Sequence, residues 1–252
     1  MKIVIIGTGH AAHALARKIA GTPHEIVAIG GRDQQEAKSL ARKIHTHHFP
    51  WPGEVPPSDI CLLCVSDDAI PKLASQLRLP DTTVAHCAGS VSMSVLKPIS
   101  SRIGVFYPLQ SLRKEIISLP VIPVCINGNT EAVQQQLASL AMAMSGDQYV
   151  VCDDSTRLHL HIAAVFVNNF VNHLYAEAED FCRKEGIDFT MLRPLILETS
   201  NRIRNLSPAL SQTGPAIRHD ELTIRKHLEQ LEKHPQLKSL YEVLTASIQG
   251  MK

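Results

Sequence analysis

Apolar residues follow two different patterns along the chain, and the change comes near residue 153. Before it, short and almost solidly apolar runs alternate with segments whose apolar residues recur at helical spacing. Strands that are apolar on both faces are typical of a mostly parallel sheet covered by helices on both sides. We therefore predict an α/β domain over residues 1–152, with a doubly wound, mostly parallel Rossmann sheet. Its predicted strands are 2–6, 25–29, 59–65, 82–87, 103–106, 121–126 and 148–152, and its predicted helices are 11–20, 34–44, 70–77 and 130–144.

After residue 153 strand signals almost vanish and helical spacing takes over. Asp153 or Asp154 can cap a long helix that runs to about Glu185 and is ended by Gly186. Further helices are predicted after residue 189, over 218–232 and from residue 235. These patterns predict a second, helical domain over residues 153–252.

Two stretches raise the question of a metal site. The segment His45–Gly53 holds three histidines, but no carboxylate or cysteine lies close to them in sequence, so we predict an exposed loop. Cys61 and Cys64 have the spacing of half a zinc site. Within a strand, however, a separation of three residues puts their side chains on opposite faces. We predict free, buried thiols and no metal.

A glycine turn follows the first predicted strand, where the chain reads GTGHAA from residue 7 to residue 12. Gly7 permits the tight turn, Gly9 lets a pyrophosphate approach the backbone, and the small Ala12 lets the helix pack closely on the strand. The helix N-terminus then presents free amides to the phosphates. A bare structural turn is the alternative. The predicted cofactor contacts here are Gly7, Thr8, Gly9, His10 and Ala11.

The end of the second predicted strand bears on which dinucleotide is bound. An acidic residue about 20 positions after the motif would hold both ribose hydroxyls of NAD. That position is Arg32, and the acid Asp33 comes one residue later. An arginine suits the 2′-phosphate of NADP through charge-assisted bonds. We therefore predict NADP as the cofactor; the alternative is that Asp33 binds the ribose and Arg32 lies at a solvent edge.

Two further strand ends face the same edge of the predicted sheet. Ser66 and Asp67 follow the third strand, and Gly89 follows the next one. Ligands of doubly wound sheets lie outside the carboxyl ends of the strands, so these residues complete the predicted cofactor site. Asp67 and Asp68 are equally suited to cap the helix that begins near residue 70.

Composition excludes several classes of partner. The net charge is +1, so no overall field attracts nucleic acid or anionic lipid. Aromatic residues make up only 4% of the chain, which argues against a stacking platform for single strands. No apolar run approaches about 18 residues, and the N-terminus shows no cleavage site. We expect a cytoplasmic protein with neither a nucleic-acid nor a membrane partner.

Three later stretches, Phe106–Ser111, His159–Asn169 and Thr213–Asp220, sharpen this picture. Together with the glycine turn, they resemble a family of bacterial Rossmann-like oxidoreductases whose C-terminal helical domain has no assigned function. That family is similar to pyrroline-5-carboxylate reductase, to coenzyme F420-dependent NADP reductases and to the 6-phosphogluconate dehydrogenase superfamily. The resemblance covers essentially the whole chain. It implies NADP binding and a smaller all-α domain of the 6-phosphogluconate dehydrogenase C-terminal type, but no particular substrate.

The first long helix of the second domain departs from the dehydrogenase pattern. The β-hydroxyacid dehydrogenases use a lysine and an asparagine there, whereas this chain has no lysine between residues 153 and 182. At 100° per residue, Arg157, His161 and Asn168 fall on one stripe, and Asn169 lies about 80° from His161. We predict His161 as a proton donor or oxygen polariser, Asn169 as a group that orients the substrate, and Asn168 as a substrate contact. Polar residues satisfied by the core or by a subunit interface are the alternative.

Two other segments supply candidate substrate contacts. Tyr107 follows a sheet strand and is a candidate general acid. The loop at Gly214 leads into a helix predicted to start near Arg218, whose N-terminus suits a carboxylate or phosphate. Thr213 and Arg218 are natural anion ligands, and Asp220 either orients Arg218 or caps the helix. A loop that only fixes helix docking or a dimer is the alternative.

These residues predict an NADP-dependent reductase or dehydrogenase for a small carbonyl, imine or hydroxy acid, bound in a cleft between the two domains. The resemblance implies a homodimer formed through the helical domain. The missing lysine favours an alternative, a non-catalytic NADP-binding sensor or subunit. A third interpretation is an F420-linked NADP reductase.

Overall fold

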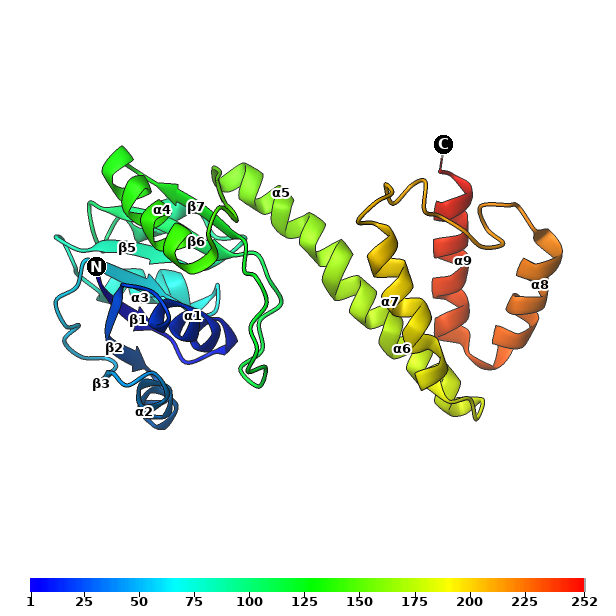
Figure 1. The fold of residues 1–252 in the computed structure, drawn as a ribbon, viewed down its shortest axis with the longest axis horizontal. Coiled ribbons are helices and arrows are strands. Elements are labelled where there is room, and N and C mark those ends of the chain that lie inside the picture. Colours follow the sequence, from blue (N-terminus) through cyan, green and yellow to red (C-terminus); the bar gives the residue numbers. More distant parts are fainter. Residues whose placement is uncertain (252) are drawn as a thin grey trace. The chain divides into compact units, whose positions relative to one another are not determined.

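The computed structural model describes residues 1–251, and its N-terminal part is built on one eight-stranded sheet (Figure 1). The strands lie in the order β3-β2-β1-β4-β5-β6-β7-β8, and every pair is parallel except β6 with β7. Because the chain crosses over β1 between β3 and β4, the carboxyl end of β1 is the topological switch point. The strands are β1 Lys2–Ile6, β2 Glu25–Gly31, β3 His47–Pro50, β4 Ile60–Leu63, β5 Thr83–His86, β6 Ile103–Pro108, β7 Val124–Gly128 and β8 Tyr149–Val151.

Helices cover both faces of this sheet, as the apolar runs predict. Alternate residues of β1 enter separate cores: Ile3 and Ile5 pack in one cluster, and Val4 and Ile6 pack in the other. The first cluster includes residues of helices α1 His10–Ala20, α2 Gln34–Lys43 and α4 Glu131–Ser145, and the second includes residues of α3 Ala69–Gln76 and of the 3₁₀ turn Met93–Leu96. The doubly wound sheet is therefore confirmed.

Cys61 and Cys64 also lie in separate core clusters, because they occupy opposite faces of the sheet. Cys64 instead lies beside Cys87, with 3.5 Å between the two sulfur atoms. All six cysteines are free. Among residues 1–251, no three potential metal-ligating side chains gather at one place.

The chain divides by its internal contacts into two compact units, one ending at Asn168 and one beginning at Asn169. The division falls inside a continuous helical run that consists of α5 Asp154–Ala164, a π-helical turn Val165–Phe170 and α6 Val171–Lys184. Asp153 caps α5, since its carboxylate accepts the Thr156 N–H at 2.8 Å. The predicted boundary at residue 152 is the start of this run.

The second unit is helical throughout its regular elements. After α6 come α7 Arg193–Arg202, α8 Glu221–Gln230 and α9 Pro235–Gln249, with 3₁₀ turns at Phe189–Leu192 and Leu231–Lys233. Gly186, at φ +70°, follows the end of α6, in accord with the predicted stop. Within residues 1–251, no helix is both long enough and apolar enough to cross a membrane.

Two local predictions were wrong. The segment predicted as a loop at 45–53 contains β3, which pairs with β2 and buries Phe49. A Cβ on Gly30 would lie 2.3 Å from the Phe49 ring, so the ring fits only against a glycine. The two outward-facing histidines of this edge strand concealed its pattern. The other error concerns α8, which begins at Glu221 rather than near Arg218 because residues 215–219 form turns.

Candidate functional site

The glycine turn joins the end of β1 to α1 under tight steric constraint. Gly7 has φ +139°, and its N–H donates to the Gly30 carbonyl at 2.8 Å. A Cβ on Gly7 would lie 2.1 Å from the carbonyl oxygen of Cys64, so no other residue fits without a backbone shift. A Cβ on Gly9, in contrast, would meet no atom within 4 Å. Gly9 therefore leaves open space directly above the turn.

The N-terminus of α1 has no internal partner for its free amides. Gly9 occupies the N-cap position and has no side chain to cap the helix, and the first turn holds no acidic residue. The helices α2, α4, α5 and α8 are capped by the side chains of Asp33, Thr130, Asp153 and Asp220. At α1, in contrast to these four helices, no side chain caps the N–H groups, so they and the positive end of the helix dipole are left for an external anion.

A cavity of about 740 Å³ lies over this turn, and its size is in the range of small-molecule and cofactor sites. Its lining includes the apolar side chains of Trp51, Val65 and Leu73. The sequence did not indicate Trp51, because it follows the unpredicted strand β3. The lining residues are Ile6, Gly7, Thr8, Gly9, Gly31, Arg32, Asp33, Trp51, Cys64, Val65, Ser66, Ala69 and Leu73.

Arg32 and Asp33 line the same cavity, but only Asp33 is engaged in a helix cap. The Asp33 carboxylate accepts the Glu36 N–H at 3.0 Å and so caps α2. Arg32 is exposed and lines the cavity. The cation is thus the freer of the two charged groups to meet an incoming ligand.

The other predicted cofactor contacts are placed unevenly around the cavity. Thr8 and Ser66 line it, whereas His10 and Ala11 do not. The His10 Nδ1 accepts the backbone N–H of Lys114 at 3.0 Å. Asp67 lies outside the lining and accepts a hydrogen bond from Ser90 Oγ. Asp68 stands at the N-cap position of α3 without a capping hydrogen bond, so neither aspartate caps that helix with its side chain.

A second group of predicted residues meets at the carboxyl ends of β5 and β6. The Tyr107 Oη and the His161 Nδ1 lie 2.9 Å apart, and their rings meet edge to face. Gly89 packs against both, since a Cβ there would lie 2.8 Å from His161 Nδ1 and 3.0 Å from Tyr107 Cζ. Strand register aligns Ile6, Leu63 and His86 across β1, β4 and β5. Two strand spacings, about 10 Å, thus separate the glycine turn from the end of β5 along one sheet edge.

Tyr107 holds its proton at neutral pH. Burial, together with the neighbouring Cys125 and Asp67, raises the pKa of the Tyr107 phenol above its usual value, and the Arg157 cation only partly offsets this. The phenol is therefore available as a proton donor. Its distance to His161 allows either group to donate to the other, depending on the imidazole tautomer.

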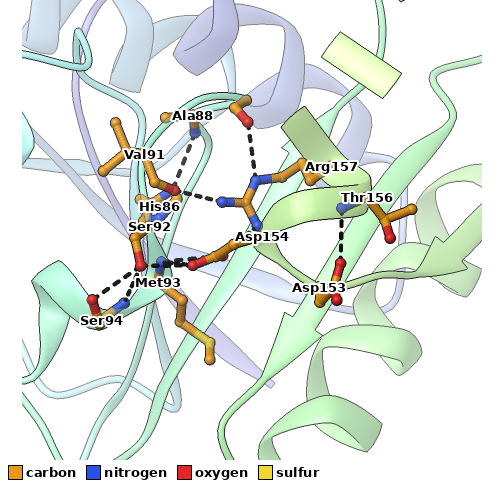
Figure 2. Close-up of polar contacts among 11 residues, drawn as sticks. His86, Ala88, Val91, Ser92, Met93, Ser94, Asp153, Asp154, Thr156 and Arg157 are labelled. Carbon is orange, nitrogen blue, oxygen red and sulfur yellow. Dashed lines mark hydrogen bonds and ion pairs between the residues drawn. The ribbon is translucent and has the colours of Figure 1, made fainter. Parts of the chain in front are cut away.

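Arg157 is buried directly beside this pair, and Figure 2 shows its guanidinium between Val91 and Asp154. It donates to the carbonyl of Gly89 at 3.2 Å and to the carbonyl of Val91, and it forms a 2.8 Å ion pair with Asp154. Arg157 therefore does not reach toward a ligand, although it shares a helix face with His161. Asn168 lies in a π-helical turn that begins at Val165, where the angle per residue differs from that of the regular α-helix on which the predicted stripe is based.

His86 lies under the loop that follows β5. Its Nδ1 accepts the Ala88 N–H at 3.2 Å. Burial first, and then the charge of Arg157, lower the pKa of His86 to about 4. The imidazole is neutral in the folded protein near pH 7.

The remaining candidates belong to the helical run and to the second unit. Asn168 and Asn169 are exposed within the π turn. Thr213 and Arg218 are exposed, and Gly214 has φ +108°. Asp220 is the N-cap of α8: its two carboxylate oxygens accept the N–H and the Oγ1–H of Thr223. These bonds lower the pKa of Asp220, helped by Arg218, so an anionic carboxylate already occupies this helix N-terminus.

Two protein-family models match the chain. One is described as NADP oxidoreductase, coenzyme F420-dependent, and matches residues 2–88. The other is described as a domain of unknown function, DUF2520, and matches residues 122–248. A comparison with curated protein sequences returns no match.

Several solved structures share the fold over nearly the whole chain. A protein from Bacteroides fragilis, named a putative NADP oxidoreductase, is 33% identical with a TM-score of 0.91, and the match covers 98% of this chain and 97% of that one. The 1-pyrroline-5-carboxylate reductase of Streptococcus pyogenes is 15% identical with a TM-score of 0.65, covering 99% and 98%. A reductive aminase from Aspergillus terreus, in complex with NADPH and ethyl-5-oxohexanoate, is 14% identical with a TM-score of 0.71, covering 99% and 95%. At such identities the last two matches show the fold alone.

The pKa of His86 predicts acid sensitivity. Between pH 6.5 and about 4 the unfolded chain binds a proton at this residue and the folded chain does not, so stability falls as the pH is lowered. We expect His86 to account for a loss of about 2 kcal/mol in unfolding free energy between pH 7 and pH 5. Urea unfolding at the two pH values measures it. In His86→Asn, whose amide oxygen can accept the Ala88 N–H, most of this pH dependence should disappear; an unchanged dependence would contradict the assignment.

Proposed function

The chain belongs to the family of NADP oxidoreductases that carry the DUF2520 domain, and from that premise we propose an NADP-dependent reductase or dehydrogenase acting on a small carbonyl, imine or hydroxy-acid metabolite. One observation carries the proposal. The open turn at Gly9, on an uncapped helix N-terminus, shares a sheet edge with the phenol–imidazole pair of Tyr107 and His161. The first feature suits a diphosphate and the second suits proton transfer.

The residues present fit NADP. The pyrophosphate would lie against the amides of Gly9 and α1, where no side chain intrudes. The exposed Arg32 would bind the 2′-phosphate, while Asp33 is engaged as a helix cap. Trp51 and Leu73 offer an apolar wall to the adenine. The reactive half would extend the other way along the sheet edge, past β4 toward Gly89.

At the reactive end the chain supplies the proton. When bound, the dihydronicotinamide provides a hydride equivalent. The Tyr107 phenol, protonated at neutral pH, would give its proton to the developing oxygen or nitrogen of the substrate. His161, whose Nδ1 lies 2.9 Å from the Tyr107 Oη, would return a proton to Tyr107 or donate to the substrate in its place. This pair takes the role that lysine plays in the β-hydroxyacid dehydrogenases.

Substrate contacts remain predictions. Asn168 and Asn169 carry amides that can hold a carbonyl or carboxylate oxygen, and the π turn that contains both is a feature frequent at functional sites. Thr213, Gly214 and Arg218 stay candidates for an anionic end of the substrate. Asp220 is better explained as the cap of α8.

Two rival functions have their own support. The absence of lysine along α5 and through the π turn favours a non-catalytic NADP-binding sensor or subunit. The F420-dependent name of the matching family favours an F420-linked NADP reductase. All three interpretations share NADP binding. Hydride exchange with a deazaflavin, but not with carbonyl or imine compounds, would identify the F420-linked function.

The cofactor assignment predicts a selective effect of Arg32→Ala. Losing a hydrogen-bonded pair with a phosphate typically costs about 1.5–3 kcal/mol, so NADPH affinity should fall about 10- to 100-fold while NADH affinity stays nearly constant. Fluorescence titration with both nucleotides measures this. An equal loss for both nucleotides would remove the 2′-phosphate argument.

Gly9→Ala serves as the matched test of the turn itself. Its Cβ meets open space in the free protein, so the melting temperature should fall only slightly, by the lower preference for alanine at a helix N-cap, but the added methyl should block the diphosphate. Gly7→Ala should lower the melting temperature, because its Cβ collides with Cys64. If wild-type protein binds neither NADPH nor NADH at millimolar concentration, the proposed function fails.

The proton-transfer roles predict a split between binding and turnover. General acid–base groups typically contribute about 10²- to 10⁴-fold to rate. We expect His161→Ala and Tyr107→Phe to reduce substrate-dependent NADPH oxidation by such factors while NADPH affinity is retained. A panel of small ketones, cyclic imines and hydroxy acids, followed at 340 nm, provides the measurement. Activity that survives both substitutions would contradict the roles of Tyr107 and His161, whereas wild-type protein that binds NADPH but oxidises it with none of these compounds would favour the sensor or F420 alternative.

We also propose that the chain forms a homodimer through its helical unit. Large apolar side chains are exposed there, among them Met191 at 75%, Leu195 at 60%, Leu210 at 78% and Val243 at 67%. Soluble monomers rarely expose so much apolar surface on one small unit. Sedimentation equilibrium should give twice the chain mass, and Leu195→Glu should shift the equilibrium toward monomer. A wild-type monomer at tens of micromolar would contradict the proposal.

A further inference from the structure

The Asp154–Arg157 ion pair lies on α5, outside both the sheet and the lining of the cofactor cavity. Arg157 is 1% exposed, and Asp154 is 39% exposed. Burying an unpaired guanidinium would cost several kcal/mol, so its partners must compensate for lost water. Those partners are two backbone carbonyls, of Gly89 and Val91, and the Asp154 carboxylate.

Asp154 also binds the loop after β5 to which Gly89 and Val91 belong. Its carboxylate accepts the Ser92 hydroxyl at 2.6 Å and the Met93 N–H at 3.1 Å (Figure 2). Burial raises the pKa of Asp154, but the bonds from Ser92, Arg157 and Met93 outweigh it and leave the pKa below its usual value. One turn of α5 therefore fixes residues 89, 91, 92 and 93 of the loop that follows β5.

The next turn of the same helix carries His161, four residues after Arg157, where side chains are neighbours on one helix face. Gly89, whose carbonyl Arg157 holds, is packed against both His161 and Tyr107. The guanidinium thus sets the distance between the Gly89 backbone and the imidazole. Because Gly89 packs directly against both rings, a shift of the loop would press on, or release, the side chains whose contact is 2.9 Å.

We infer that Asp154 and Arg157 are positioning residues, which hold the loop 89–93 so that Tyr107 and His161 form one proton-transferring pair. Neither touches the substrate. Lysine cannot replace Arg157, because the three guanidinium nitrogens each meet a different partner, whereas the three donors of an ammonium group lie on one nitrogen atom. The catalytic meaning of this inference rests on the proposed function; the geometric part does not.

The chain offers a matched pair of substitutions. Asp154→Asn removes the charge that Arg157 needs, whereas Asp153→Asn makes the same change one residue earlier, at an exposed helix cap that asparagine serves equally well. Arg157→Lys and Ser92→Ala test the guanidinium and one loop bond separately. Arg157→Met also removes the cation.

The readout is the side-chain ¹⁵N spectrum of His161, assigned by comparison with His161→Gln and recorded without cofactor. We expect Asp154→Asn and Arg157→Lys to displace the Nδ1 resonance, Ser92→Ala to displace it less, and Asp153→Asn to leave it in place. In Arg157→Met the alkaline absorbance titration of Tyr107, isolated by subtracting Tyr107→Phe, should move to higher pH, because a cation that lowers the Tyr107 pKa is lost. NADPH affinity should fall far less than in Arg32→Ala, since the glycine turn and Arg32 lie away from the loop 89–93.

Two outcomes separate this inference from the proposed function. If folded Asp154→Asn and Arg157→Lys give the same His161 resonance as Asp153→Asn, the ion pair is only structural and the inference is overturned. If Arg157→Met does not fold, Asp154→Asn and Ser92→Ala still decide the question. Failure of the wild-type protein to bind NADPH would instead overturn the proposed function and leave the His161 measurement intact.

Discussion

The structure depends on one close approach, that of Gly7 to the carbonyl of Cys64. There is no room for a Cβ between them, so the chain can leave β1 only through a glycine at positive φ. This turn brings the start of α1 over the carboxyl ends of β1 and β4, at the switch point of the sheet. The open space above Gly9, the uncapped amides of α1 and the cavity bounded by Arg32 and Trp51 all follow from it.

A second constraint acts at the other end of the same sheet edge. The buried charge of Arg157 must be neutralised and hydrogen-bonded, and the loop after β5 and Asp154 supply these partners. Satisfying that charge places Gly89 between His161 and Tyr107. The two constraints produce one end with an uncapped helix N-terminus and one end with a phenol–imidazole pair, with strands β1, β4 and β5 side by side between them.

Most of the fold and about half of the site followed from local signals. Solidly apolar runs gave the central strands, and Gly7, Gly9 and Arg32 stood at positions whose spacing has a direct physical meaning. Strand β3 was missed because two of its four residues are exposed histidines, and Trp51 was missed with it. Tyr107 and His161, 54 positions apart, were each chosen for their chemistry, but no periodicity indicated that they meet.

By itself, the sequence determined the layered sheet, the glycine turn and the helical character of the second half, because these depend on residue type and on spacing within one or two turns of chain. Only the tertiary structure decided that Arg157 is buried and bonded to the loop after β5, that Asp33 and Asp220 serve as helix caps, and that a π turn follows α5. These outcomes depend on which distant backbone groups a side chain reaches and on the need to satisfy a buried charge. Residue spacing along the chain reveals neither the backbone groups that a side chain reaches nor the charges that become buried, since both arise when strands and helices far apart in sequence are packed together.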